Sequence, residues 1–70
     1  MANSMNEIIR ENIKKYRNKR NLSQVQLAIK CSLSSEYVSE IERGKRLPSL
    51  KRLLMIAQAL EIEPHKFFLK

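Results

Sequence analysis

The sequence predicts an all-α fold, a compact bundle of five helices in a single domain over residues 1–70. Apolar residues recur at helical spacing along most of the chain, and no stretch alternates polar and apolar residues over several positions. One glycine and two prolines leave few points at which a helix must end. Hydrophobic residues make up 43% of the chain, which is enough for a packed core.

The first helix is predicted to begin near Asn6, because Ser4 and Glu7 have the spacing of a capping box. Its apolar stripe consists of Ile9, Ile13 and Tyr16. The stripe breaks between Asn18 and Asn21, and asparagine is one of the residues that take the left-handed conformation at a helix end. We therefore expect the helix to end there.

Two short helices follow. Ser23 opens a second capping box and starts a helix that ends near Cys31. After a tight turn, Ser34 caps a third helix over about residues 35–43. Gly44 ends this helix, because glycine adopts the left-handed conformation at the lowest cost.

The remaining residues predict a fourth helix and a last short one. Ser49 caps the fourth helix, which runs to about Leu60 and whose apolar face contains Leu50, Leu53, Leu54, Ile56, Ala57 and Leu60. Pro64 suits the first turn of the last helix. Phe67 and Phe68 lie near its end, and we expect one of them to close the core.

The composition argues against an enzyme. The chain has no aspartate, one histidine and one cysteine, which excludes an internal disulfide and a closed Cys/His zinc site. It contains no P-loop, glycine-rich dinucleotide turn or HExxH motif. A deep pocket with several convergent polar groups is hard to build at this size. We expect no enzymatic activity, cofactor, metal or small-molecule ligand.

The chain is strongly basic, with a net charge of +7 and a pI of about 10.0. Nucleic acid and an anionic membrane are the natural partners of such a field. A membrane is disfavoured, because the longest apolar run is too short to span one and no helix sets a strongly basic face opposite a broad apolar one. One cysteine and no signal-peptide core are typical of a cytoplasmic protein.

The second and third helices, joined by about four residues, have the spacing of a helix-turn-helix motif over about residues 23–43. In such a motif the second helix enters the major groove of DNA. An ordinary helical hairpin has the same spacing and is the alternative. The positive charge favours DNA, because phosphate binding requires it.

The chain resembles the Cro and phage-repressor (XRE-type) family of helix-turn-helix domains over roughly residues 9–69. The resemblance depends on an ordered series of motifs: Leu22-Ser23-Gln24, Leu27-Ala28, Tyr37-Val38-Ser39, Ile41-Glu42-Arg43-Gly44, Lys45-Arg46, Pro48-Ser49-Leu50, Leu53, Ile56-Ala57 and Ala59-Leu60. It implies a lambda-repressor-like bundle of five helices that binds operator DNA as a symmetric dimer. The family usually has glycine at the position of Ser32, where serine costs about 1 kcal/mol.

The resemblance implies a set of DNA contacts. The residues expected to contact bases are Ser35, Glu36, Ser39 and Arg46. Those expected to contact phosphates are Ser23, Gln24, Tyr37, Arg43 and Lys45. The alternatives are a solvated helix face for the first group, a capping side chain for Gln24 and core packing for Tyr37. For the basic run Arg43, Lys45 and Arg46 the alternative is a solvated charged face. Glu40 shares the third helix's polar face, but phosphate would repel it.

Further residues are expected to have structural roles. In the resembled family an arginine of the first helix and a glutamate at the end of the third form a partly buried ion pair, which here corresponds to Arg17 and Glu42. Cys31 is expected to be a buried, inert thiol.

The expected dimer interface contains Leu50, Leu54, Met55, Ile62, Phe67 and Phe68, because the chain's end is too apolar to be free.

We predict a sequence-specific transcription regulator that binds a palindromic operator as a homodimer. Its length favours a restriction–modification controller over a phage repressor or a DNA-binding antitoxin. The alternative from another class is an antitoxin or coactivator that uses the same fold to bind a protein. We expect it in the cytoplasm of a bacterium or a phage-infected cell, associated with the nucleoid.

Overall fold

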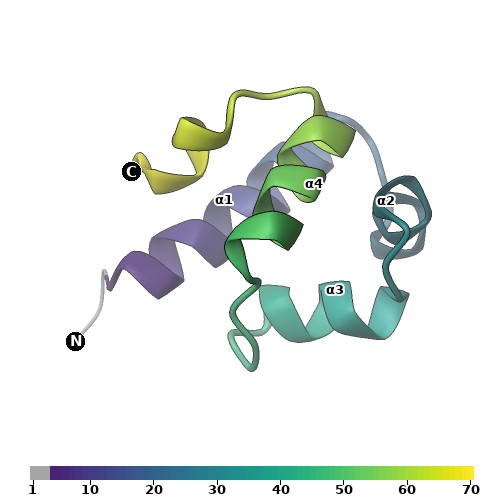
Figure 1. The fold of residues 1–70 in the computed structure, drawn as a ribbon, viewed down its shortest axis with the longest axis horizontal. Helices are drawn as coiled ribbons and strands as arrows, with labels where there is room; N and C mark the ends of the chain where they lie inside the picture. Colours follow the sequence, from purple (N-terminus) through teal and green to yellow (C-terminus); the bar gives the residue numbers. More distant parts are fainter. Residues whose placement is uncertain (1–3) are drawn as a thin grey trace.

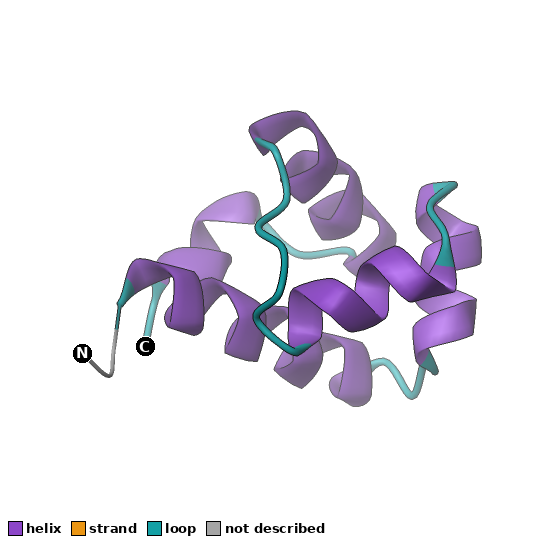
Figure 2. Ribbon diagram, turned by 90° about the horizontal axis from the view of Figure 1, so that it is seen from below, coloured by secondary structure: helices purple, strands orange, loops and turns teal. Residues whose placement is uncertain are grey.

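The structure is a computed structural model that describes residues 4–70, and this part of the chain is helical with short connections (Figures 1 and 2). Its elements are α1 (Met5–Lys19), α2 (Gln24–Cys31), α3 (Ser35–Glu42), α4 (Leu50–Leu60) and the 3-10 helix η1 (Pro64–Phe68). No strand occurs among these residues. The all-α fold class is therefore confirmed.

The prediction of five helices is wrong, because the described chain has four α-helices and its last segment is a 3-10 helix. The bonds Lys66 N–H to Glu63 O, 3.0 Å, and Leu69 N–H to Lys66 O, 3.4 Å, span three residues. Pro64 at the first turn brings no N–H, and five residues are too few for a regular α-helical ladder.

All four α-helices begin at the serines that the sequence indicated as caps. Each serine hydroxyl accepts a hydrogen bond from the backbone N–H three residues later: Ser4 from Glu7, Ser23 from Gln26, Ser34 from Tyr37 and Ser49 from Arg52, at 3.0–3.2 Å. Ser23 and Gln26 complete a capping box, since the Gln26 side chain also accepts from the Ser23 N–H at 2.8 Å. Each such cap contributes about 1 kcal/mol to helix stability.

All four α-helices also end in the same way, with a left-handed residue. The residues are Asn21 (φ 57°), Ser32 (φ 60°), Gly44 (φ 79°) and Glu61 (φ 58°). After each, two backbone N–H groups close back on the last helical turn, as with Ser32 to Ile29 O at 3.2 Å and Leu33 to Ala28 O at 2.9 Å. This is the Schellman arrangement. Only one of the four positions is a glycine, so three non-glycine residues carry a conformational cost.

The helices enclose one apolar core. Its members are Ile9, Ile13, Leu27, Ala28, Cys31, Val38, Ile41, Leu53, Ile56, Ala57, Leu60 and Phe67. α1 contacts α3, α4 and η1, and α2 contacts α3 and α4 (Figure 1). α2 and α3 therefore lie at one end of the molecule and η1 packs on α1 at the other.

Phe67 closes the core, and the prediction that it contributes to a dimer interface is wrong. Its side chain is 0% exposed, and its ring meets that of Tyr16 edge to face, with centroids 6.5 Å apart. The buried Asn12 side chain donates to the carbonyl oxygens of Phe67 and Leu69, at 2.8 and 2.6 Å. These bonds hold the end of the chain on α1 and commit Phe67 to the interior.

Candidate nucleic-acid interface

The turn between α2 and α3 is held in a fixed geometry. Ser32 takes the left-handed conformation that ends α2, and Ser34 caps α3 two residues later. Leu33, between them, is half-buried and packs against the core. Because Leu27, Ala28 and Cys31 of α2 are buried together with Val38 and Ile41 of α3, the two helices form one rigid unit.

α3 presents a polar face opposite its buried one. Val38 and Ile41 point into the core, while Ser35 and Glu36 are exposed and Ser39 and Glu40 are half-buried. Figure 2 views the molecule from the side on which α3 lies. The first turn of α3 is thus free to enter a groove, and all four polar residues lie on the side facing away from the core.

The loop between α3 and α4 presents the basic residues of this surface. Arg43, Lys45 and Arg46 are all exposed, and Gly44 has a φ of 79° that turns the chain between them. A Cβ on this glycine would lie 3.2 Å from Arg10 Nε, so the turn is also tightly packed against α1. We call residues 43–49 the basic loop.

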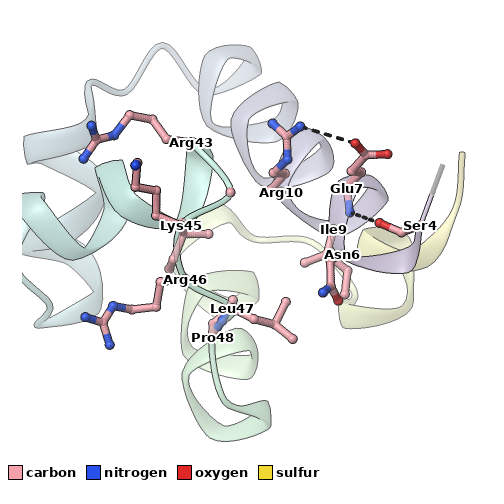
Figure 3. Close-up of a pocket in the computed structure, with 12 residues that line it drawn as sticks. Ser4, Asn6, Glu7, Ile9, Arg10, Arg43, Lys45, Arg46, Leu47 and Pro48 are labelled. Carbon is pink, nitrogen blue, oxygen red and sulfur yellow. Dashed lines mark hydrogen bonds and ion pairs between the residues drawn. The ribbon is translucent and has the colours of Figure 1, made fainter. Parts of the chain in front are cut away.

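The basic loop directs its charges outward. A cleft of about 380 Å³ separates it from the first turn of α1. Figure 3 shows the side chains of Arg43, Lys45 and Arg46 extending away from the α1 residues across this cleft. Although these three residues line the cleft, the charged ends of their side chains point away from α1 (Figure 3).

Arg17 and Glu42 form a buried ion pair that ties α1 to the end of α3. Arg17 Nε lies 2.7 Å from Glu42 Oε2, and Arg17 Nη2 lies 3.0 Å from Oε1. Each residue is 8% exposed. Arg17 Nη1 donates to Leu22 O at 2.7 Å, and Gln24 Nε2 donates to Glu42 Oε1 at 3.0 Å. The pair thus also anchors the start of α2.

This network bears on the predicted role of Gln24. One of its amide hydrogens is occupied by Glu42, and the other remains for a second acceptor. Ser23 accepts from Gln26 N–H as a cap, and its hydroxyl hydrogen is likewise free to donate. The predicted phosphate contacts of these two residues are compatible with their structural bonds.

Tyr37, Glu40, Arg46 and Arg52 form a cluster that joins α3, the basic loop and α4. The guanidinium carbons of Arg46 and Arg52 lie 5.5 and 5.1 Å from the centre of the Tyr37 ring, within cation–π range. Arg46 Nε donates to Glu40 Oε1 at 2.9 Å. The sequence indicated Arg52 only as part of a second basic patch at the start of the fourth helix, and it gave no sign that Arg46 pairs with Glu40. No spacing rule within a helix could have paired them, because the turn at Gly44 lies between them.

Other basic residues are engaged elsewhere. Arg20 donates from Nε to Leu60 O at 2.8 Å and from Nη2 to Glu61 O at 3.2 Å. These bonds satisfy carbonyl groups at the end of α4, where a positive charge is also favourable. Lys15 and Lys19 lie over the Tyr16 ring on α1. Their charge lies on α1, outside the basic loop.

The remaining predicted interface residues lie on α4 and beyond it. Leu50 is 69% exposed, Leu54 45% and Phe68 40%, while Met55 and Ile62 are half-buried. α4 and η1 are in contact. Apart from Phe67, these residues are therefore accessible in the isolated chain.

Residues 4–70 contain no group of three His, Cys, Asp or Glu side chains that could hold a metal ion. In the same region no helix has the length and apolar character needed to cross a membrane.

Burial raises the pKa of the Cys31 thiol. Cys31 is therefore held in its unreactive protonated form at neutral pH.

The family comparison matches residues 13–67 to the helix-turn-helix family. The control protein C.BamHI of Bacillus amyloliquefaciens is 37% identical over 65 residues, which cover 91% of this chain and 80% of that protein. The immunity repressor of Bacillus phage phi105 is 47% identical over 53 residues, and this chain spans 37% of its length. The crystal structure of the restriction-modification controller protein C.AhdI from Aeromonas hydrophila matches with a TM-score of 0.86 at 36% identity, covering 90% of this chain and 96% of that one.

Proposed function

The chain belongs to the helix-turn-helix family, and from that premise we propose that it is a DNA-binding transcription regulator that reads its operator with α3. The observation that carries the proposal is the free polar face of α3 beside an exposed basic loop. A helix inserted in the major groove can contact base edges, and flanking basic residues can hold the phosphates. We propose that residues 1–70 form one such domain, without enzymatic activity.

Base contacts come from the groove-facing residues. Ser35 and Glu36, in the first turn of α3, reach deepest, and Ser39 follows one turn later. Glu36 can accept a hydrogen bond from cytosine N4, whereas serine hydroxyls discriminate bases weakly. Arg46 reaches a base from the basic loop.

Phosphate contacts flank the groove on both sides. Arg43 and Lys45 supply charge from the basic loop, and the Tyr37 hydroxyl adds a donor. Ser23 and Gln24 lie at the start of α2, where unpaired backbone N–H groups and the helix dipole also favour an anion. These contacts position the protein and carry little sequence information.

We propose that the protein acts as a homodimer on a palindromic operator. The exposed Leu50, Leu54 and Phe68, with the half-buried Met55 and Ile62, form its interface. Two copies of α3 related by a two-fold axis then read half-sites about 34 Å apart. The likeness to the restriction-modification controller protein C.AhdI supports the same role for this chain, and we place it in the bacterial cytoplasm with its DNA target.

Selection of bound duplexes from a random DNA library tests this function. We expect an enriched palindrome whose half-sites are one helical turn apart, bound with an affinity that falls as salt rises. Binding that depends on salt but shows no sequence preference would contradict the proposal.

The alternative function, binding of a protein partner, is favoured by the exposed apolar residues on α4. It predicts little loss of function when Ser35 and Glu36 are changed.

A further inference from the structure

Arg46 differs from the other two basic side chains of the basic loop in having partners of its own. Its Nε donates to Glu40 Oε1 at 2.9 Å, and its guanidinium lies 5.5 Å from the centre of the Tyr37 ring. Arg43 and Lys45 make no side-chain hydrogen bond or ion pair within residues 4–70. Two charges of the loop are therefore free, and the third is held in one orientation.

The bond to Glu40 uses only one edge of the guanidinium. Arginine has five N–H donors in a planar fork, and Glu40 occupies the one on Nε. Within the described residues, the hydrogens on Nη1 and Nη2 have no hydrogen-bond acceptor. The Arg46 side chain is 54% exposed, whereas that of Glu40 is 29% exposed. The arginine thus has its partner on the protein side and its free donors available to solvent.

Glu40 otherwise makes this surface less favourable for DNA. It lies one turn after Glu36 on the same helix, and like charges at that spacing destabilise a helix. A carboxylate beside the groove also repels phosphate. Within residues 4–70, Arg46 is the only hydrogen-bond or ion-pair partner of the Glu40 carboxylate. A role for this carboxylate must therefore lie in what it does to Arg46.

We propose that Glu40 is a positioning residue that sets sequence specificity by orienting Arg46 toward a guanine in the major groove. With Nε held by Glu40 and one face on Tyr37, the free Nη donors match the O6 and N7 acceptors of guanine, the commonest specific contact of arginine. The same carboxylate holds Arg46 back from phosphates and so lowers non-specific binding. This inference depends on the proposed function.

The test uses the whole chain and compares Glu40→Ala, Arg46→Ala and the double variant in the selection from random duplexes. We expect wild type to prefer guanine at one position in each half-site, by roughly 5- to 150-fold over other bases. Arg46→Ala should abolish this preference, and Glu40→Ala should reduce it ~10-fold while its affinity for random DNA stays equal or rises. The double variant should match Arg46→Ala.

The control is Glu63→Ala, which removes an exposed carboxylate without a side-chain capping bond, beyond the far end of α4. It should keep the wild-type preference. A Glu40→Ala variant that changes operator and random-DNA affinities by the same factor overturns the inference, because charge or folding alone would do that. Glu40→Gln, which keeps an acceptor, should fall between wild type and Glu40→Ala and serves if the alanine variant does not fold. If wild type selects no sequence, the proposed function itself fails.

Discussion

The Glu42 side chain is bonded to residues of two other helices. Its two carboxylate oxygens accept from Arg17 on α1 and from Gln24 on α2, while the residue itself ends α3. It therefore joins the three helices that must keep their relative positions for α3 to be presented. The pair is buried, so if one partner were removed, water could not solvate the charge of the other.

Glu42→Ala is expected to destabilise the domain by roughly 3–5 kcal/mol, since it leaves the buried Arg17 guanidinium without a counter-charge. Urea unfolding followed by circular dichroism measures this change. Glu63→Ala, at an exposed site, is the matched control and should have little effect. An unfolding midpoint for Glu42→Ala equal to that of wild type would contradict the buried-pair interpretation.

The four α-helices share one kind of start and one kind of end. Serine caps start all four α-helices, and left-handed residues end them. The apolar residues that follow three of the left-handed positions, Leu22, Leu33 and Ile62, pack against the core, as the Schellman motif favours. The turn of the helix-turn-helix is therefore stable even though a serine occupies its left-handed position.

Ser32→Gly is expected to stabilise the domain by up to about 1 kcal/mol, because glycine avoids the strain of the left-handed conformation but loses more chain entropy on folding. For a domain of this size, this raises the melting temperature by roughly 4–8 °C. Gly44→Ala should do the opposite, because φ is +79° and the new Cβ would lie 3.2 Å from Arg10 Nε. Equal melting temperatures of Ser32→Gly and wild type would show that the serine is not strained.

Arg43 and Lys45 of the basic loop have a different role from α3 under the proposed function. Arg43→Ala and Lys45→Ala should weaken binding to all DNA sequences alike and reduce the slope of log affinity against log salt by about 0.9 each. Fluorescence anisotropy with operator and random duplexes measures both quantities. Lys66→Ala removes an exposed lysine from η1, at the other end of the molecule, and should leave the slope unchanged. A change in sequence preference in either loop variant would assign a base contact to it.

At the scale of the whole molecule, a basic chain of 70 residues buries one small core, and domains of this size are marginally stable alone. The exposed apolar residues of α4 and η1 are the surface on which self-association would add buried area. Because Phe67 is buried, Phe68 is the phenylalanine that is accessible on this surface.

Leu54→Glu is expected to convert the proposed dimer into a monomer, because it places a charge in an apolar contact. Leu54 is 45% exposed in the isolated chain, so the monomer should keep its helical circular dichroism spectrum. Sedimentation velocity at micromolar concentration measures the mass. Ile29→Glu, an equivalent change at an exposed residue of α2, should remain dimeric. A wild-type chain that sediments as a monomer would rule out the proposed interface.

Much of this arrangement follows from local sequence. Ser4, Ser23, Ser34 and Ser49 mark the starts of the α-helices, and Gly44 marks an end, because a cap depends on residues only three or four positions apart. The apolar periodicity likewise identifies most of the core. The pairing of Arg17 with Glu42 could be predicted only through resemblance to a family, since nothing in their spacing relates residues on separate helices.

Other features depend on how the helices pack together. Both Phe67 and Phe68 are apolar enough to be buried, and the position of η1 on α1 places Phe67 inside. Gln24 donates to Glu42, and Arg46 to Glu40, across turns whose direction no local pattern specifies. Caps and periodicity act within one helix and are visible in the sequence. Contacts between helices require the packed core that orients them, and the specificity of the proposed DNA surface depends on those contacts.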